Sequence, residues 1–180
     1  MALTPAPPVR RGRRRALWAA GGGLLLLLLL LLLGVTMARR YPRINDITTD
    51  VERPPVYWVQ PPERGTYHAE RFRAQTEAAY GDLKNLDLAL PPDAAYARVL
   101  ALVQARGWPI AARDDAGHRV QAVAVTLVLR FRDDVIVEVR PGPSPARSAI
   151  AMRSKSRIGT GDFGANAKRI RAFFADLKNG

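Results

Sequence analysis

The residues best suited to chemistry surround a glycine-rich stretch near the C-terminus, residues 159–164. Five basic residues precede or follow this stretch: Arg153, Lys155, Arg157, Lys168 and Arg169. A glycine-rich turn that enters a helix presents backbone N–H groups, and guanidinium groups add charged hydrogen-bond donors. The pattern therefore predicts a site for an anion such as phosphate, sulfate or a carboxylate. The candidate ligand-binding residues are Asp46, Arg153, Ser156, Arg157, Asn166 and Arg169.

A structural role is the alternative for the same residues. Asp162 stands where the N-cap of the following helix is expected, and its carboxylate would occupy the N–H groups that an anion needs. The arginines would then pair with carboxylates elsewhere in the chain, since ion-pair networks commonly resemble binding sites. The acids expected in such pairs are Asp46, Asp50, Asp133 and Asp134.

Residues 159–164 also match the pattern G-x-G-x-x-G of dinucleotide-binding proteins. That fingerprint requires a further parallel strand and an acid about 20 residues later, but only 16 residues follow Gly164. The sequence Asp162-Phe163-Gly164 spells the metal-binding motif of kinases, yet no kinase catalytic loop precedes it. Neither class of nucleotide-binding protein is therefore predicted.

Residues for an enzymatic mechanism are few. His68 and His118 are the only histidines and the chain has no cysteine, so no zinc site, disulfide or thiol nucleophile is predicted. Asp133 and Asp134 are expected to form a tight turn before a strand. Ser154 and the lysine that follows it would point to opposite faces of a strand, so they do not form a catalytic pair. No catalytic residue, cofactor or metal is predicted.

The longest apolar stretch lies near the N-terminus and contains ten consecutive leucines, residues 24–33. Residues 16–37 include no charged residue, and as a helix this stretch would be roughly 33 Å long, enough for a hydrocarbon core of about 30 Å. A helix of a soluble domain would show polar positions on one face, and this stretch has no such face. We therefore predict a transmembrane helix or signal anchor over residues 16–38, in contact with membrane lipids.

Arginines on the two sides of this stretch predict its orientation. Five arginines precede it, and Arg39, Arg40 and Arg43 follow it. Because positive charge is enriched on the cytoplasmic side, residues 1–15 are expected to form a basic cytoplasmic tail and residues 41–180 an extracytoplasmic, periplasmic domain. A cleaved signal peptide is the alternative, although two arginines directly after the small-residue site at Ala38 would be unusual.

The net charge of +12 is concentrated around the apolar stretch. Seven arginines within the first 40 residues leave a charge of only +5 for the domain that follows. Arginines beside a membrane helix suit anionic lipid headgroups, and an extracytoplasmic domain would rarely meet nucleic acid. Membrane lipids are therefore predicted as partners, whereas nucleic acid is not.

Hydrophobic periodicity in the second half of the chain predicts an α+β domain. We expect a helix between Pro92 and Gly107, strands over residues 108–112, 120–131, 135–140 and 148–154, and a last helix starting near Asp162. Short turns between the strands predict a four-stranded antiparallel meander with both helices on one face. The segment before them is expected to be largely irregular, with an ordered loop or edge segment from residue 41 and helical composition over residues 67–80.

Several short motifs in this domain carry a family resemblance. They are Ile44-Asn45-Asp46-Ile47-Thr48-Thr49-Asp50, Gly107-Trp108, Phe131-x-Asp133-Asp134-Val135, Arg153-Ser154-x-Ser156-Arg157-x-Gly159 and Asp162-x-Gly164-x-Asn166-Ala167-x-Arg169-Ile170. In this order they resemble the domain of unknown function 1499 family over about residues 41–178. The resemblance implies no activity, cofactor or catalytic residue. Members of that family have an acid where this chain has Gln121.

These observations predict a membrane-anchored, extracytoplasmic domain without catalytic activity. Its expected ligand is a small anionic or lipidic molecule, or an envelope partner protein, bound close to the membrane surface. A hydrolase-like enzyme that uses the Asp, Arg and Ser residues is one alternative. A purely structural envelope protein without a pocket is the other.

Overall fold

The computed structural model describes residues 11–59, 69–126 and 130–180. The chain divides into two compact units, residues 1–40 and residues 41–180. Two predictions fall partly outside the described residues. They are the first ten residues of the predicted cytoplasmic tail and residues 127–129 of the predicted strand over residues 120–131.

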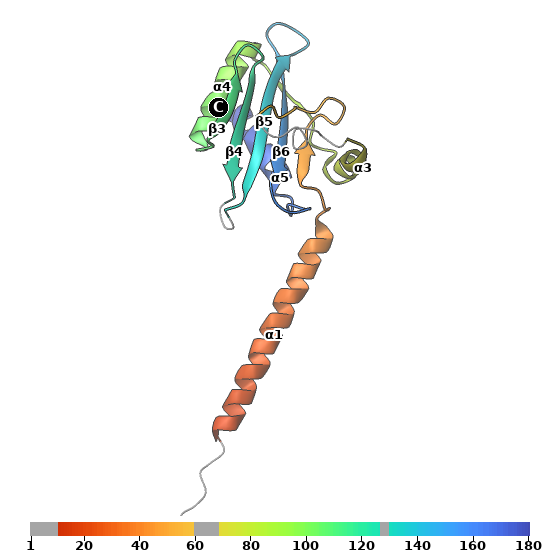
Figure 1. Ribbon diagram of the computed structural model, residues 1–180, viewed down its shortest axis with the longest axis vertical. Coiled ribbons are helices and arrows are strands. Elements are labelled where there is room, and N and C mark those ends of the chain that lie inside the picture. Colours follow the sequence, from red (N-terminus) through yellow and green to blue (C-terminus); the bar gives the residue numbers. More distant parts are fainter. Residues whose placement is uncertain (1–10, 60–68, 127–129) are drawn as a thin grey trace, which may run out of the picture. The chain divides into compact units, whose positions relative to one another are not determined.

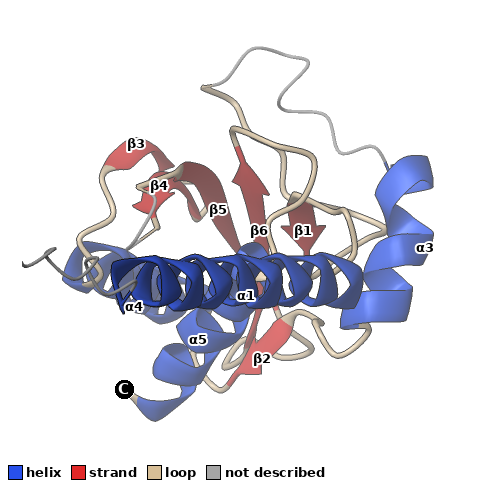
Figure 2. Ribbon diagram, turned by 90° about the horizontal axis from the view of Figure 1, so that it is seen from below, coloured by secondary structure: helices blue, strands red, loops and turns tan. Residues whose placement is uncertain are grey.

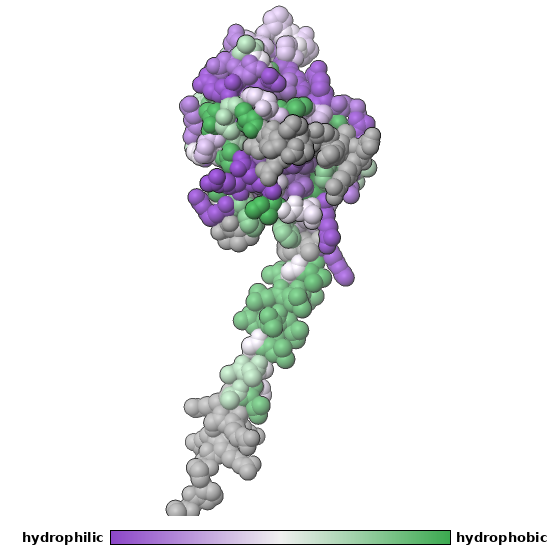
Figure 3. Space-filling model, viewed as in Figure 1, coloured by the Kyte–Doolittle hydropathy of each residue, from purple (hydrophilic) through white to green (hydrophobic). Residues whose placement is uncertain are grey.

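The first unit contains one long helix, α1 (Arg11–Arg40). Within it, the 21-residue stretch Ala16–Thr36 contains an 18-residue window with a mean hydropathy of 2.5, and none of that window is buried inside the protein. A helix of that length measures roughly 32 Å, which suffices to cross a hydrocarbon core. Figure 3 shows this stretch as a largely hydrophobic surface, whereas hydrophilic residues predominate among the coloured residues on the face of the second unit drawn there. By length and composition, the chain has one candidate membrane span among the described residues.

The second unit is built on an antiparallel sheet in the order β1-β6-β5-β4-β3, with β2 also paired to β6 (Figure 1). The predicted meander corresponds to β3 (Ile110–Asp114), β4 (Arg119–Val125), β5 (Arg132–Pro141) and β6 (Ser148–Ser156). The predicted number of four strands was wrong. Two short strands, β1 (Asp46–Thr48) and β2 (Leu86–Leu88), pair with opposite ends of β6 and bring the number to six. Three residues are too few for an alternating pattern to be recognised, and the long neighbour β6 decides the pairing.

Three helices of the second unit lie within the described residues: α3 (Ala69–Tyr80), α4 (Pro92–Ala105) and α5 (Ala165–Asn179). Helices α4 and α5 pack against each other and on the same face of the sheet (Figure 2). Helix α3 lies within the residues of predicted helical composition and packs beside β1. Together with β1 and β2 it makes the segment before α4 more regular than predicted. Gly107, at a φ of +63°, follows the C-terminus of α4 in a conformation that favours glycine.

The main hydrophobic core lies between the sheet and helices α4 and α5. Its fully buried members include Val99, Val103, Ile150, Met152, Ile170 and Phe173. Alternate residues of β5 point to the opposite face, where Ile136 is also fully buried. That face is covered by residues 51–59, here called the covering segment, which hydrogen-bond to β4, β5 and β6. Strand β5 is therefore buried on both sides over most of its length.

The tight turn predicted at Asp133 and Asp134 was also wrong, because both residues lie inside β5. Their exposed fractions are 1% and 3%. Consecutive acids in a sequence usually predict a surface turn. In the fold each of these carboxylates is paired with an arginine, and this pairing offsets the cost of burying the charge. The last helix, which was expected to start near Asp162, begins at Ala165.

Candidate functional site

The first polar cluster is a buried ion pair between Asp46 of β1 and Arg153 of β6. The guanidinium donates from Nε to Oδ1 at 2.8 Å and from Nη2 to Oδ2 at 2.6 Å. The side chains of Arg153 and Asp46 are 0% and 1% exposed. Nη1 of Arg153 donates to the carbonyl of Pro55 in the covering segment at 3.1 Å. The pair thus ties β1, β6 and the covering segment together.

Tyr57 of the covering segment packs against this ion pair. Its ring centroid lies 4.9 Å from Cζ of Arg153, a distance suited to a cation–π contact. The hydroxyl of Tyr57 donates to the carbonyl of Asp134 at 2.8 Å. Burial, together with the nearby carboxylate of Asp46, raises the pKa of Tyr57 well above its usual value. Tyr57 therefore keeps its proton and acts as a hydrogen-bond donor.

The second polar cluster lies on the opposite face, where α5 packs on the sheet. Arg169 donates to Asp133 at 2.5 Å and to the hydroxyl of Ser154 at 2.8 Å. Ser154 in turn donates to Oδ1 of Asn166 at 2.6 Å. Asn166 donates from Nδ2 to the hydroxyl of Ser156 at 3.0 Å. The first turn of α5 is thereby joined to β5 and β6 through neutral and charged hydrogen bonds.

Carboxylates of the chain also occupy the two remaining anion-binding features. Arg157 donates to Asp134 from Nε at 3.0 Å and from Nη2 at 2.6 Å, and this interaction raises the pKa of Arg157. At the start of α5, Asp162 accepts from the N–H groups of Gly164 and Asn166, each at 2.8 Å. These N–H groups are the ones that an anion at the helix N-terminus would use.

The structure therefore separates the six predicted ligand-binding residues into different groups. Asp46 and Arg153 form one pair on the face under the covering segment, whereas Ser156, Asn166 and Arg169 belong to the cluster on the helical face. Arg157 pairs with Asp134 at the end of the sheet. The carboxylates that hold the arginines are Asp46, Asp133 and Asp134, three of the four acids that the structural alternative names.

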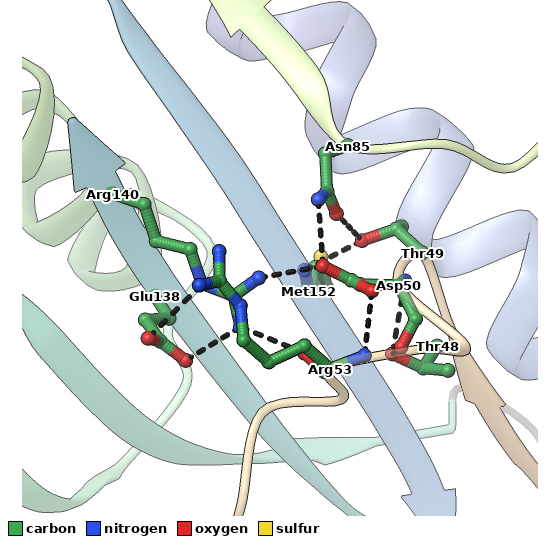
Figure 4. A network of polar contacts seen from close by, with 8 residues as sticks. All are labelled: Thr48, Thr49, Asp50, Arg53, Asn85, Glu138, Arg140 and Met152. Atoms are coloured by element: carbon green, nitrogen blue, oxygen red, sulfur yellow. Dashed lines mark hydrogen bonds and ion pairs between the residues drawn. The ribbon is translucent and has the colours of Figure 1, made fainter. Parts of the chain in front are cut away.

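The fourth acid, Asp50, anchors a separate network shown in Figure 4. Arg140 donates to Asp50 at 2.6 Å and to both oxygens of Glu138 at 3.1 Å. Asn85 donates to the same oxygen of Asp50 at 3.0 Å. Burial opposes ionisation of Asp50, but hydrogen bonds from the Arg53 backbone, Asn85 and Arg140 outweigh it and lower its pKa. Asp50 is therefore held as a carboxylate.

A surface cleft of about 450 Å³ opens beside this network. Its lining residues are Arg53, Pro54, Val56, Arg119, Glu138, Arg140 and Pro141. Arg140 is occupied by Asp50 and Glu138, and Arg119 by Asp114. Within the described part of the chain, the exposed guanidinium of Arg53 has no hydrogen bond or ion pair. The cleft thus combines three cationic side chains with one carboxylate.

This cleft was not among the predicted sites. The sequence contains one indication of it. Glu138 and Arg140 alternate with Val137 and Val139, so the two charged side chains must share one face of a strand. Nothing in the sequence places Arg53 or Arg119 beside them. Arg53 comes from the covering segment, and Arg119 from the start of β4, with its Cζ 5.0 Å from the Trp58 ring centroid.

Gln121 of β4 marks the position where the resemblance implies an acid. It is fully buried and accepts a hydrogen bond from the Trp58 backbone N–H at 3.2 Å. Its side-chain nitrogen has no hydrogen-bond partner among the described residues. A carboxylate at this position would avoid the unused donor but would also bring a buried charge. The glutamine in place of an acid therefore changes the polarity under the covering segment, and it does not change the lining of the cleft.

Fold and site together define an α+β domain behind an apolar helix, with buried arginines held by the chain's own carboxylates. Residues 46–177 match the model of the family described as "Protein of unknown function (DUF1499)". The chain belongs to this family. No curated protein matches the chain.

Two solved structures are similar over about half of the chain. A crystal structure of the di-domain ARO/CYC BexL from the BE-7585A biosynthetic pathway shares 17% identity, with a TM-score of 0.39. The match covers 53% of this chain and 44% of that one, less than half of its length. A solution NMR structure from Thermobifida fusca shares 9% identity, with a TM-score of 0.36, and covers 52% and 82% of the two chains. At these TM-scores, neither likeness bears on the function of the chain.

Proposed function

We propose that this protein is a single-pass, membrane-anchored protein whose extracytoplasmic domain binds a small anion, either free or as a lipid headgroup, without catalysis. The observation that carries the proposal is the cleft beside Arg140, in which Arg53 offers an uncommitted guanidinium. Guanidinium groups suit phosphate and carboxylate because they donate two parallel hydrogen bonds. Arg140 also lines the cleft, but it is already paired with Asp50 and Glu138, so Arg53 supplies the donors for the anion.

The pairing of the other charges supports binding over catalysis. A catalytic carboxylate must be free to accept a proton from a substrate. Asp46, Asp133 and Asp134 are instead each bonded to an arginine and nearly excluded from solvent. The cleft instead offers the uncommitted guanidinium of Arg53, which can bind an anion without forming or breaking a covalent bond.

Binding is tested by titrating inorganic phosphate, and separately glycerol 3-phosphate, into the full-length protein in phosphatidylcholine nanodiscs. Arg53→Ala should weaken binding about 10- to 100-fold, because a hydrogen bond to a charged group contributes about 1.5–3 kcal/mol. Tighter binding of glycerol 3-phosphate would favour a lipid headgroup over free phosphate.

The matched control is Arg98→Ala, which removes one positive charge from α4 and leaves the cleft intact. It should leave the affinity within twofold of the unchanged protein, which is roughly 0.4 kcal/mol. Equal affinities in the Arg53 and Arg98 variants, or no binding of either phosphate compound to the unchanged protein, would contradict the proposed cleft.

Orientation is tested with reporters fused after Gly180. Five arginines before the apolar stretch against three after it favour an extracytoplasmic C-terminus. A reporter that is active only outside the cytoplasm should therefore give signal in the full-length fusion and lose it when residues 16–38 are deleted. Activity confined to a reporter that works only in the cytoplasm would reverse the assigned compartment. Release of a shortened fusion from the membrane would instead indicate a cleaved signal peptide.

A further inference from the structure

One end of the second unit carries exposed apolar side chains that the fold does not use. Phe131, Ile158 and Phe163 are 45%, 69% and 65% exposed. They are three of the five large hydrophobic residues that are exposed in the described part of this unit. Phe163 also adopts a φ of +52°, which is uncommon for an aromatic residue. Its exposed ring therefore comes with a backbone cost that packing in this unit does not explain.

These three residues belong to the end of the sheet where the chain enters the unit. The N–H of Arg157 donates to the carbonyl of Arg132 at 3.3 Å, which places the segments around Phe131 and Ile158 side by side. Asn45 donates to the carbonyl of Gly159 at 2.6 Å. A Cβ on Gly164 would lie 2.8 Å from the Tyr41 ring. The loop after β6 is thus held against residues 41–45.

Basic residues lie close in sequence to the apolar ones or in the neighbouring segments. Arg43, Arg130, Arg132 and Lys168 are all exposed, and none makes a hydrogen bond or ion pair through its side chain with the residues that the structure describes. The nearby acids are already committed, since Asp133 and Asp134 pair with arginines and Asp162 accepts backbone N–H groups. This end of the unit is therefore both apolar and positively charged.

We propose that this end docks onto the membrane leaflet from which the anchor emerges, with Phe131, Ile158 and Phe163 in the interface and the basic residues on anionic headgroups. The inference rests on the proposed anchoring by residues 16–38. Arg43 follows the end of that anchor by five residues, which reach at most roughly 18 Å. Apolar side chains close to arginine and lysine residues match the chemistry of a lipid surface. Docking restricts the domain to one orientation on the membrane.

The experiment uses the full-length protein, in which a new cysteine is unique because the chain has none. Thr160→Cys places a spin label between Ile158 and Phe163 without removing either. In nanodiscs of phosphatidylcholine and phosphatidylglycerol, collisions with oxygen relative to a water-soluble nickel chelate should be several-fold higher at residue 160 than at Ser144→Cys. Ser144 is an exposed residue in the turn at the other end of β5 and β6.

Two further variants make the test decisive. Adding Ile158→Ser and Phe163→Ser to Thr160→Cys should lower the ratio to that of the label at residue 144. A label at Leu28→Cys reports separately on insertion of the anchor. Lipid contact at residue 28 with equal, water-like ratios at residues 160 and 144 overturns docking and leaves the anchor in place. Water contact at residue 28 overturns both.

Discussion

Replacing Asp46 with alanine is expected to lower the free energy of unfolding of the second unit by about 3–5 kcal/mol. The substitution leaves Arg153, whose side chain is fully buried, without the carboxylate that accepts two of its hydrogen bonds. A buried charge that loses its partner costs more than the pair contributes when intact. Urea unfolding of the full-length protein in detergent micelles, followed by tryptophan fluorescence, measures the change.

The control for Asp46→Ala removes both charges at once. The double variant Asp46→Leu with Arg153→Met replaces the pair with apolar side chains and should recover most of the lost stability. Urea dependence of the unfolding free energy should stay unchanged, since the same surface is exposed on unfolding. A double variant as unstable as Asp46→Ala would show that the contacts of Arg153 with Pro55 and Tyr57, rather than the buried charge, dominate.

Replacing Phe173 with alanine is expected to cost about 3–5 kcal/mol by opening a cavity under α5. Phe173 is fully buried and stacks on Trp108, with centroids 5.5 Å apart and an interplanar angle of 14°. The guanidinium of Arg106 lies 5.5 Å from the Phe173 ring and 5.3 Å from the Trp108 ring. Loss of the ring therefore removes both a packing contact and a cation–π partner.

Phe163→Ala is the matched control because it deletes the same side chain at an exposed position. It should change stability in detergent by less than about 0.5 kcal/mol. Similar costs for the two phenylalanine variants would contradict the position of the core between α5 and the sheet. The contrast also separates the two phenylalanines by role, since only Phe163 is placed at the proposed membrane contact.

The resemblance to the domain of unknown function 1499 family was confirmed over residues 46–177, and the α+β class was confirmed as well. Strands β3 to β6 and helices α4 and α5 carry periodic apolar residues over at least five positions, which is enough for a local signal. Strands β1 and β2 are only three residues long and depend on β6 as a template. Their pairing is a non-local contact that no local pattern contains.

The polar clusters show the same division. The presence of both arginines and acids in the domain predicts that ion pairs form, but it does not predict which residues pair. Asp46 and Arg153 are separated by 107 positions, and Asp50 and Arg140 by 90. Which acid meets which arginine depends on the register of β6 with its neighbours. The register also decides which groups stay free, and so the cleft beside Arg53 was not predicted.

The order of residues near the N-terminus is sufficient to predict an apolar helix long enough to cross a membrane. An unbroken run of leucines can be recognised without knowing any tertiary contact. Periodicity likewise determined the class of the domain. Folding, by contrast, buries the acids expected at a turn and pairs all three arginines of the predicted anion site with carboxylates of the chain. The reason is physical: the free energy of a buried charge depends on the groups brought beside it by folding, whereas the hydrophobicity of a segment belongs to the segment itself.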